Sequence, residues 1–164
     1  MKTKSILIAF IMLIFLPSLT IFSQKPDFSG EWKLNKEKSE VPDNQLFLSK
    51  ITIQLKSDSL LTTRVYENGT GEEYPFDENL SLDGKECKIT IYDMPRTSTA
   101  TKTDADGSIS IASTTTFTAN GGQDDMIAKE TWKIENEGQF LTLDFTNKMS
   151  GNEVAGKYYY EKSK

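Results

Sequence analysis

The chain of 164 residues contains no histidine and only one cysteine. Without histidine, neither a Ser-His-Asp nor a Cys-His nucleophile can form, and an imidazole metal site is excluded as well. With Cys87 alone, the chain cannot form an internal disulfide. The sequence therefore predicts no metal ion and no cofactor, and it indicates that the protein is not an enzyme.

Cys87 and the acidic residues are the reactive groups that remain to be considered. Cys87 shares an alternating face with Ile89 and Ile91, which predicts a buried apolar side chain, and a free reactive thiol is the alternative. The acids occur as neighbours, at 72–73 and 124–125. Neighbours on a strand point to opposite faces, so neither pair can share a catalytic site.

Basic residues are too few and too scattered to form a binding patch. Arg64 and Arg96 are the only arginines, and 19 basic residues stand against 24 acidic ones, for a formal net charge of −5. A negative protein repels nucleic acid and anionic membrane surfaces. We therefore expect no nucleic-acid partner.

The first 23 residues have the layout of a secretory signal peptide. Lys2 and Lys4 precede an apolar run at 6–16, and no acid occurs before Asp27. The run is shorter than the roughly 20 residues that span a bilayer as a helix, and the small Ser23 favours cleavage after it. A retained membrane anchor is the alternative. Cleavage would leave a domain at 24–164, with a net charge of −7, that is secreted or periplasmic and has no stable membrane insertion.

The remainder of the chain alternates apolar and polar residues. Ile51, Ile53 and Leu55 alternate with polar neighbours, and the pattern returns at 108–112 and 141–145. A period of two is typical of strands with one face in a core and one in water. Asn-Gly and Asp-Gly dipeptides lie between the strands and favour tight hairpins.

These turn signals divide the chain into ten expected strands. The expected strands are 28–35, 46–56, 59–67, 73–82, 86–92, 96–103, 108–118, 126–135, 139–146 and 153–161. A sheet of that size tends to curl and close, which also removes its exposed edges. We expect an all-β fold, an up-and-down antiparallel β-barrel of about 8–10 strands.

The first expected strand carries a family resemblance. Phe28-Ser29-Gly30-Glu31-Trp32-Lys33-Leu34 resembles the Gly-x-Trp start of lipocalins and fatty-acid-binding proteins. With Asn35-Lys36-Glu37-Lys38-Ser39 behind it, the segment is most similar to secreted bacterial lipocalin-like domain proteins, whose first strand commonly reads Phe-x-Gly-x-Trp-Lys-Leu-Asn. Thr131-Trp132 before a hairpin also resembles that group. The Thr-Asp-Tyr type turn of lipocalins is missing.

The resemblance implies structural roles for Gly30 and Trp32. Trp32 would close one end of the barrel, and Gly30 would let the chain pass close by. A cation would lie on the face of the indole, and Lys157 and Arg64 are the two candidates for it.

The resemblance also implies ligand contacts. Fatty-acid-binding proteins hold a ligand carboxylate with an Arg-x-Tyr on a late strand, and the nearest match is Lys157-Tyr158-Tyr159. Lys157 and Tyr159 are therefore candidate ligand-binding residues, although lysine lacks the fork of arginine. A solvent-exposed position on the strand is the alternative for Lys157.

Strand parity adds Arg64, Glu130 and Trp132 to the candidate ligand-binding residues. If Trp132 faces inward then Glu130 does too, and Arg64 shares a face with Leu60 and Tyr66. A buried Glu130 needs a cationic or hydrogen-bonding partner. An internal ion pair, a wet position at the rim and a polar ligand pocket all satisfy that need.

Two functional hypotheses follow. The first is a secreted lipocalin-like barrel that binds a small hydrophobic or amphipathic molecule inside, without catalysis. The second is a cell-envelope interaction module that binds a protein or polysaccharide through its loops or outer face. They differ in whether the barrel is hollow, and the sequence leaves this open. The large residues Phe117, Trp132, Phe145 and Tyr158 could fill a small barrel.

Overall fold

The computed structural model describes residues 26–41, 46–119 and 122–163. The expected signal peptide at 1–23 lies outside this part of the chain. Within the same ranges, no helix combines the length and the apolar character needed to cross a membrane.

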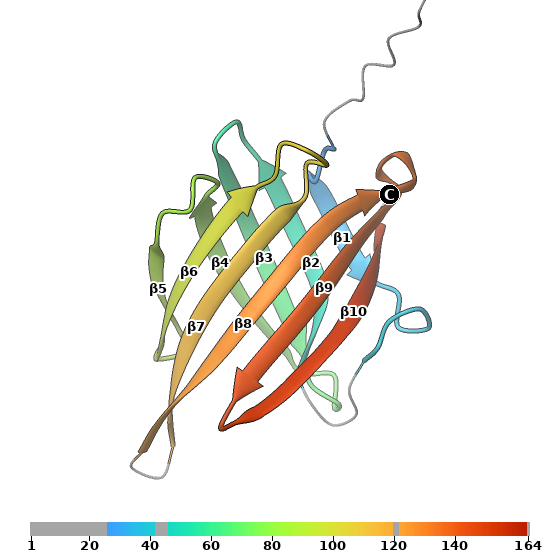
Figure 1. Ribbon diagram of the computed structural model, residues 1–164. Helices are drawn as coiled ribbons and strands as arrows, with labels where there is room; N and C mark the ends of the chain where they lie inside the picture. Colours follow the sequence, from blue (N-terminus) through green and yellow to red (C-terminus); the bar gives the residue numbers. More distant parts are fainter. Residues whose placement is uncertain (1–25, 42–45, 120–121, 164) are drawn as a thin grey trace, which may run out of the picture.

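Ten strands form one antiparallel sheet that curls into a nearly closed barrel (Figure 1). The strands are β1 (Gly30–Leu34), β2 (Phe47–Leu55), β3 (Ser59–Glu67), β4 (Glu73–Ser81), β5 (Cys87–Ile91), β6 (Met94–Lys102), β7 (Ile109–Ala119), β8 (Gly122–Glu135), β9 (Phe140–Met149) and β10 (Asn152–Lys162). Their order in the sheet is β4-β3-β2-β1-β10-β9-β8-β7-β6-β5. The expected all-β, up-and-down antiparallel barrel is confirmed.

The two ends of the barrel are named here after residues that mark them. The Trp32 end holds the turns β2–β3, β4–β5, β6–β7 and β8–β9, the last formed by a short 3-10 turn at Asn136–Gly138. The Tyr92 end holds the turns β3–β4, β5–β6 and β9–β10. Successive strands run between these ends, so inward-facing side chains of different strands form layers across the interior.

Side chains alternate between the interior and solvent as the sequence predicted. On β8, Ala128, Glu130 and Trp132 are buried, and on β3 the residues Leu60 and Arg64 are buried. The apolar core comprises Phe28, Trp32, Phe47, Leu48, Ile51, Ile53, Leu60, Leu80, Ala100, Ile109, Ile111, Trp132, Leu141, Leu143, Phe145, Tyr158 and Tyr160. Burial of this apolar surface is the main force that holds the sheet curled.

Trp32 is fully buried near the barrel end that carries its name. Its indole Nε1 donates a hydrogen bond of 2.8 Å to the carbonyl oxygen of Phe28. Lys162, its partner on β10, places its Nζ 5.2 Å from the centre of the indole ring. Trp32 thus satisfies its one polar group locally while its ring packs in the core and under a cation.

The expectation that Lys157 or Arg64 covers this indole was wrong. Lys157 lies over the ring of Tyr159, and Arg64 lies over the ring of Trp132. Lys162 takes the position because it is directly opposite the tryptophan in the β1–β10 ladder.

A seam between β4 and β5 interrupts the barrel, because these strands are the two edges of the sheet. Near the Trp32 end, the amide of Gly84 donates to the carbonyl of Ala100 at 2.9 Å. At the opposite end, the hydroxyl of Tyr92 donates to the carbonyl of Pro75 at 2.7 Å. Tyr92 has a φ of +48°, an uncommon conformation for a bulky residue. The β5–β6 turn therefore holds a strained residue where it reaches across the seam.

Gly30 offers a test of the packing around Trp32. Its φ of +133° suits only glycine, and a Cβ there would lie 2.6 Å from Cε of Lys162. We expect Gly30→Ala to lower the free energy of unfolding by about 1–3 kcal/mol, measured by urea denaturation. Gly151→Ala, with a φ of +80° and open space around it, is the control for backbone strain alone. A loss for Gly30→Ala no larger than that of the control would contradict this role.

Candidate functional site

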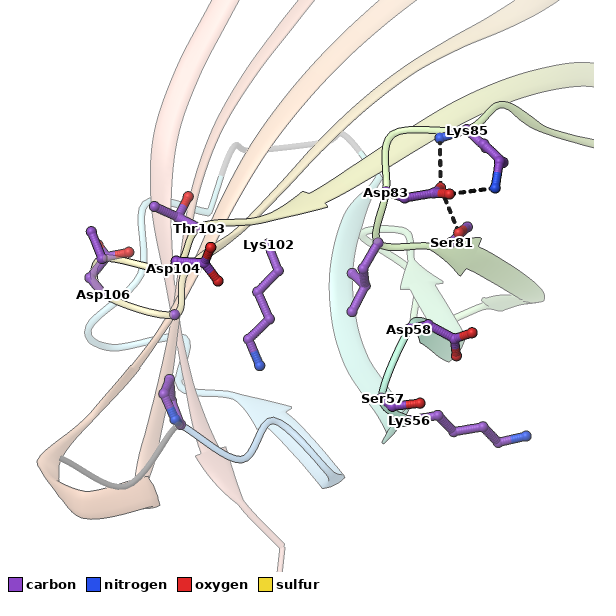
Figure 2. Close-up of a pocket in the computed structure, with 14 residues that line it drawn as sticks. Lys56, Ser57, Asp58, Ser81, Asp83, Lys85, Lys102, Thr103, Asp104 and Asp106 are labelled. Atoms are coloured by element: carbon purple, nitrogen blue, oxygen red, sulfur yellow. Dashed lines mark hydrogen bonds and ion pairs between the residues drawn. The ribbon is translucent and has the colours of Figure 1, made fainter. Parts of the chain in front are cut away.

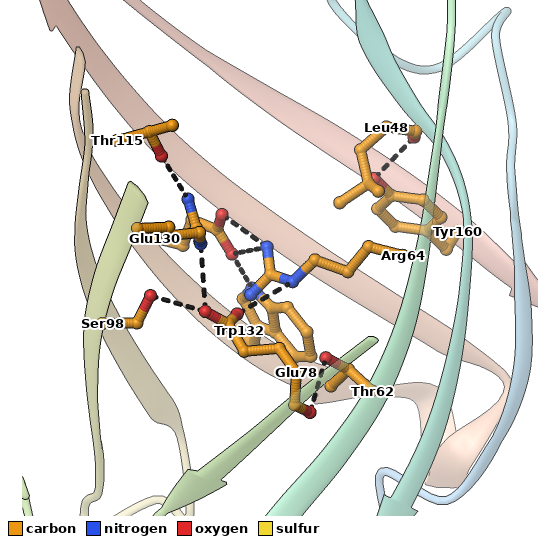
Figure 3. Close-up of polar contacts among 10 residues, drawn as sticks. Leu48, Thr62, Arg64, Glu78, Ser98, Thr115, Glu130, Trp132 and Tyr160 are labelled. Atoms are coloured by element: carbon orange, nitrogen blue, oxygen red, sulfur yellow. Dashed lines mark hydrogen bonds and ion pairs between the residues drawn. The ribbon is translucent and has the colours of Figure 1, made fainter. Parts of the chain in front are cut away.

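Two arginines and two glutamates meet inside the barrel (Figure 3). Arg64 comes from β3, Glu78 from β4, Arg96 from β6 and Glu130 from β8, and the most exposed of them, Glu130, is 8% exposed. We call these residues the four-charge cluster. Such charges are costly to bury, so their mutual pairing decides whether the site is stable.

Arg64, Glu130 and Trp132 form one half of the cluster. Nη1 of Arg64 donates to both carboxylate oxygens of Glu130, at 2.7 and 2.9 Å. The indole Nε1 of Trp132 donates to Oε2 of Glu130 at 2.8 Å, while the guanidinium lies 5.0 Å from the indole ring centre. Glu130 is thus satisfied by three donations, and Trp132 contributes both a donor and a ring face.

Glu78 and Arg96 form the other half, across the seam. Oε1 of Glu78 accepts from Nε of Arg96 at 3.0 Å and from the hydroxyl of Ser98 at 2.5 Å. Nη1 of Arg96 donates to Thr115 at 3.1 Å. Oε2 of Glu78 lies 3.7 Å from Nε of Arg64, close enough for attraction but too far for a hydrogen bond. Glu78 therefore links the two halves.

The charged forms of Glu78 and Arg64 are favoured by their partners in the cluster. Burial alone would raise the pKa of Glu78, but the charges of Arg64 and Arg96 outweigh it and the pKa is lowered. Burial alone would likewise lower the pKa of Arg64, and the charges of Glu130 and Glu78 raise it instead. Nearby Tyr158 stays neutral, because burial in the first place raises its pKa to about 12. The site is therefore a set of fixed, compensated charges.

An apolar pocket of about 380 Å³ opens at the Tyr92 end of the barrel. Its lining residues are Leu46, Met126, Phe145, Asn147, Met149, Ser150, Asn152, Val154 and Tyr158. Leu46, Met149 and Val154 are exposed to solvent, whereas Phe145 and Tyr158 are buried and pack with ring centres 4.6 Å apart. Phe145 pairs with Glu130 across the β8–β9 ladder. The inner wall of the pocket is thus next to the four-charge cluster.

A larger cleft, of about 830 Å³, lies among the turns at the Trp32 end (Figure 2). Its charged lining residues are Lys56, Asp58, Asp83, Lys85, Lys102, Asp104 and Asp106. Asp83 accepts a hydrogen bond from the hydroxyl of Ser81 and forms an ion pair with Lys85. The side chain of Lys102 extends into the cleft. In the part of the chain that the structure describes, no three histidine, cysteine or acidic residues are placed to hold a metal ion. The cleft suits a polar partner better than an apolar one.

The five candidate ligand-binding residues from the sequence divide into two groups. Arg64, Glu130 and Trp132 come together inside the barrel, and the internal ion pair is the alternative that the structure shows for Glu130. Lys157 and Tyr159 lie on the outer face of β10. There Lys157 is 3.7 Å from Asp144, which is exposed. The structure does not bring Lys157 and Tyr159 to the other three.

Glu78 and Arg96 are the site residues that sequence reasoning missed. The signal was present in both strands: Glu78 shares a face with the apolar Phe76 and Leu80, and Arg96 shares a face with Ala100, which is buried. The same parity argument that selected Arg64 and Glu130 therefore applied to them.

Cys87 packs against the apolar core, as its alternating pattern predicted, but it is only partly buried. Burial first, and the charge of Glu78 second, raise the pKa of its thiol. A raised pKa keeps the thiol protonated and disfavours the reactive alternative.

No protein-family model, no curated protein and no solved structure matches this chain. The barrel and the cluster inside it are therefore interpreted from their own geometry.

The four-charge cluster predicts a large effect for Glu130→Gln. The substitution leaves Arg64 buried without its principal counter-charge, so we expect the free energy of unfolding to fall by about 3–5 kcal/mol in urea denaturation. Glu153→Gln, at an exposed position of β10, should leave stability within about 0.5 kcal/mol of wild type. Adding Arg64→Met to Glu130→Gln should restore much of the loss, because no unpaired charge then remains at this pair. A double variant no more stable than the single one would contradict this account.

Glu78 predicts a dependence of stability on pH. Its folded pKa is lowered from the ordinary 4.5, so its stabilising effect is complete above about pH 4.5 and is lost as pH falls through the folded pKa. We expect the difference in unfolding free energy between wild type and Glu78→Gln to narrow as pH falls from about 6 toward 3. Urea denaturation at several pH values measures this difference. A constant difference would show that the charge of Glu78 does not contribute.

Proposed function

We propose that this protein is a secreted or periplasmic barrel that binds a small amphipathic molecule at the Tyr92 end, without catalysis. The observation that carries the proposal is the apolar pocket of about 380 Å³ at this end of the barrel. This volume lies within the usual range for small-molecule sites, about 300–1,000 Å³. An apolar wall with a few polar groups, here Asn147, Ser150 and Asn152, is the usual composition of such sites.

The interior supports a ligand site at one end only. Toward the Trp32 end, Trp32, Ile53 and Leu80 are at most 1% exposed and fill the barrel. Toward the Tyr92 end, the ring of Phe145 packs directly on Gly156, where a Cβ would lie 2.9 Å from Cζ of Phe145, and the apolar pocket lies on the outer side of this ring. The molecule would therefore enter at the Tyr92 end and stop at the buried rings of Phe145 and Tyr158.

The resemblance of the first strand to lipocalin-like domain proteins supports the same function. Membership of that group is part of this proposal, and so are export and cleavage after Ser23. The ten-strand barrel and the buried Trp32 agree with the resemblance, although a fold by itself does not define a function.

Binding is proposed in place of chemistry because the buried carboxylates are poorly suited to acid–base catalysis. Glu130 accepts three hydrogen bonds, and the pKa of Glu78 is lowered. A general acid or base at neutral pH works best with a pKa near 7.

The charged cleft at the Trp32 end favours a second candidate function, an envelope interaction module. Loop-borne lysines and aspartates around a space of about 830 Å³ could contact a polysaccharide or a protein. Native mass spectrometry of protein purified from its own host, before and after organic extraction, separates the two. A retained small molecule supports the first function. Its absence, together with a partner recovered from envelope fractions, supports the second.

Val154 and Ala155 provide a matched pair for testing the pocket. Val154 lines the pocket, whereas Ala155 is exposed and its side chain points to the other face of β10. We expect Val154→Asp to weaken binding of the apolar fluorescent probe N-phenylnaphthylamine by about tenfold or more, because it places a charge in the apolar wall. Ala155→Asp should leave the affinity unchanged. Equal effects of the two variants would place the probe elsewhere.

A further inference from the structure

The apolar pocket at the Tyr92 end has an inner and an outer part. Its inner part ends at the buried rings of Phe145 and Tyr158. Its outer part, toward the β9–β10 turn, is lined by the polar residues Asn147, Ser150 and Asn152. A ligand whose apolar chain lies against the rings therefore holds its polar group at the outer part, next to water.

Asp124 places a negative charge at this outer part. It is half-buried like Met126, whereas its two neighbours on β8 are exposed, so Asp124 points to the same face as the pocket-lining Met126. The carboxylate of Asp124 accepts a hydrogen bond from the hydroxyl of Ser150, which lines the pocket. Because Asp124 is only half-buried, a ligand can reach this carboxylate from the mouth of the pocket.

Glu40 places a second carboxylate beside the pocket. The segment after β1 runs along β10, where the amide of Glu40 donates to the carbonyl of Lys157 at 3.1 Å. A Cβ at Gly156 would lie 3.1 Å from Oε2 of Glu40 and 2.9 Å from Cζ of Phe145. The carboxylate of Glu40 and the ring of Phe145 therefore lie on the same side of β10, and the side chain of Glu40 is exposed.

Positive charges do not balance these two carboxylates at the mouth. None of the residues that line the pocket is a lysine or an arginine. Lys148 lies between two lining residues of β9, so its side chain points to the outer face, where Glu153 is opposite it. Lys36 forms an ion pair with Glu67 at 2.9 Å. Both arginines of the chain are in the four-charge cluster, where two glutamates balance them.

We propose that the amphipathic ligand of this pocket is an alkyl amine, whose ammonium group lies at the mouth beside Asp124 and whose chain lies against Met126 and Val154. An ammonium group only donates hydrogen bonds, and the outer part offers acceptors in the carboxylate of Asp124 and the amide oxygens of Asn147 and Asn152. A ligand carboxylate or phosphate at the same place is repelled by the like charges. This inference rests on the proposed function, since it assumes that the pocket holds a ligand.

Decylammonium and decanoate, which have chains of the same length, test the charge of the ligand. Each is used to displace N-phenylnaphthylamine from the wild-type protein at neutral pH and low ionic strength, below its micelle concentration. We expect decylammonium to bind at least about tenfold more tightly, because the carboxylates attract it and repel decanoate. Decanoate binding as tightly as decylammonium would overturn this inference alone. If the dye itself does not bind, the proposed function fails instead.

Asp124→Asn and Asp125→Asn separate the local charge from the overall negative charge of the protein. Both remove one carboxylate from β8, but Asp125 is exposed and accepts a hydrogen bond from Thr116. We expect Asp124→Asn to weaken decylammonium binding by about threefold to fivefold, as for a partly exposed ion pair, and Asp125→Asn to leave it unchanged.

Decanol, the uncharged probe of the same chain length, reports whether the pocket is intact in each variant, and its affinity should stay within about twofold of wild type. An equal loss of decylammonium affinity in both variants, or no loss in Asp124→Asn, would overturn the proposal. The wild-type comparison remains decisive if a variant does not fold.

Discussion

The pairing of Glu78 with Arg96 is the interaction on which the closed barrel depends. Backbone hydrogen bonds hold every neighbouring pair in the strand order, but they stop at β4 and β5. Glu78 crosses that gap to Arg96 and Ser98, and through Arg64 it also engages Glu130 on the far wall. Side-chain charges thus replace the missing part of the ladder.

The choice of arginine for this role has a physical basis. Both arginines of the chain are in the cluster, whereas none of the lysines that the structure describes is buried. A guanidinium offers five donors in a fixed plane and can lie flat on an aromatic ring, as Arg64 does on Trp132 and Arg96 on Phe76. An ammonium group could satisfy neither geometry. The two guanidinium groups can therefore pair with carboxylates and pack on aromatic rings at the same time.

The strands and their inward faces could be predicted from the sequence, because alternation and turn dipeptides are local properties. The partners across the barrel could not. Arg64 meets Glu130 only through the stagger of strands that are not neighbours, and Glu78 meets Arg96 where no ladder sets the register. The three consecutive tyrosines at 158–160 also leave the parity of β10 ambiguous. The core takes Tyr158 and Tyr160, which places Lys157 outside.

The seam separates two strands that are consecutive in the chain, so the chain itself connects the edges at one end of the seam and not at the other. At the Trp32 end, the short connection and the Gly84–Ala100 hydrogen bond keep β4 beside β6. At the other end, the hydroxyl of Tyr92 on Pro75 spans the gap from a strained turn. Separation of the two edges would therefore begin at Tyr92 and extend toward the Trp32 end, where the short chain connection holds β4 and β5 together. The connected part of the seam is at the packed Trp32 end of the barrel, and the part that would separate first is at the Tyr92 end.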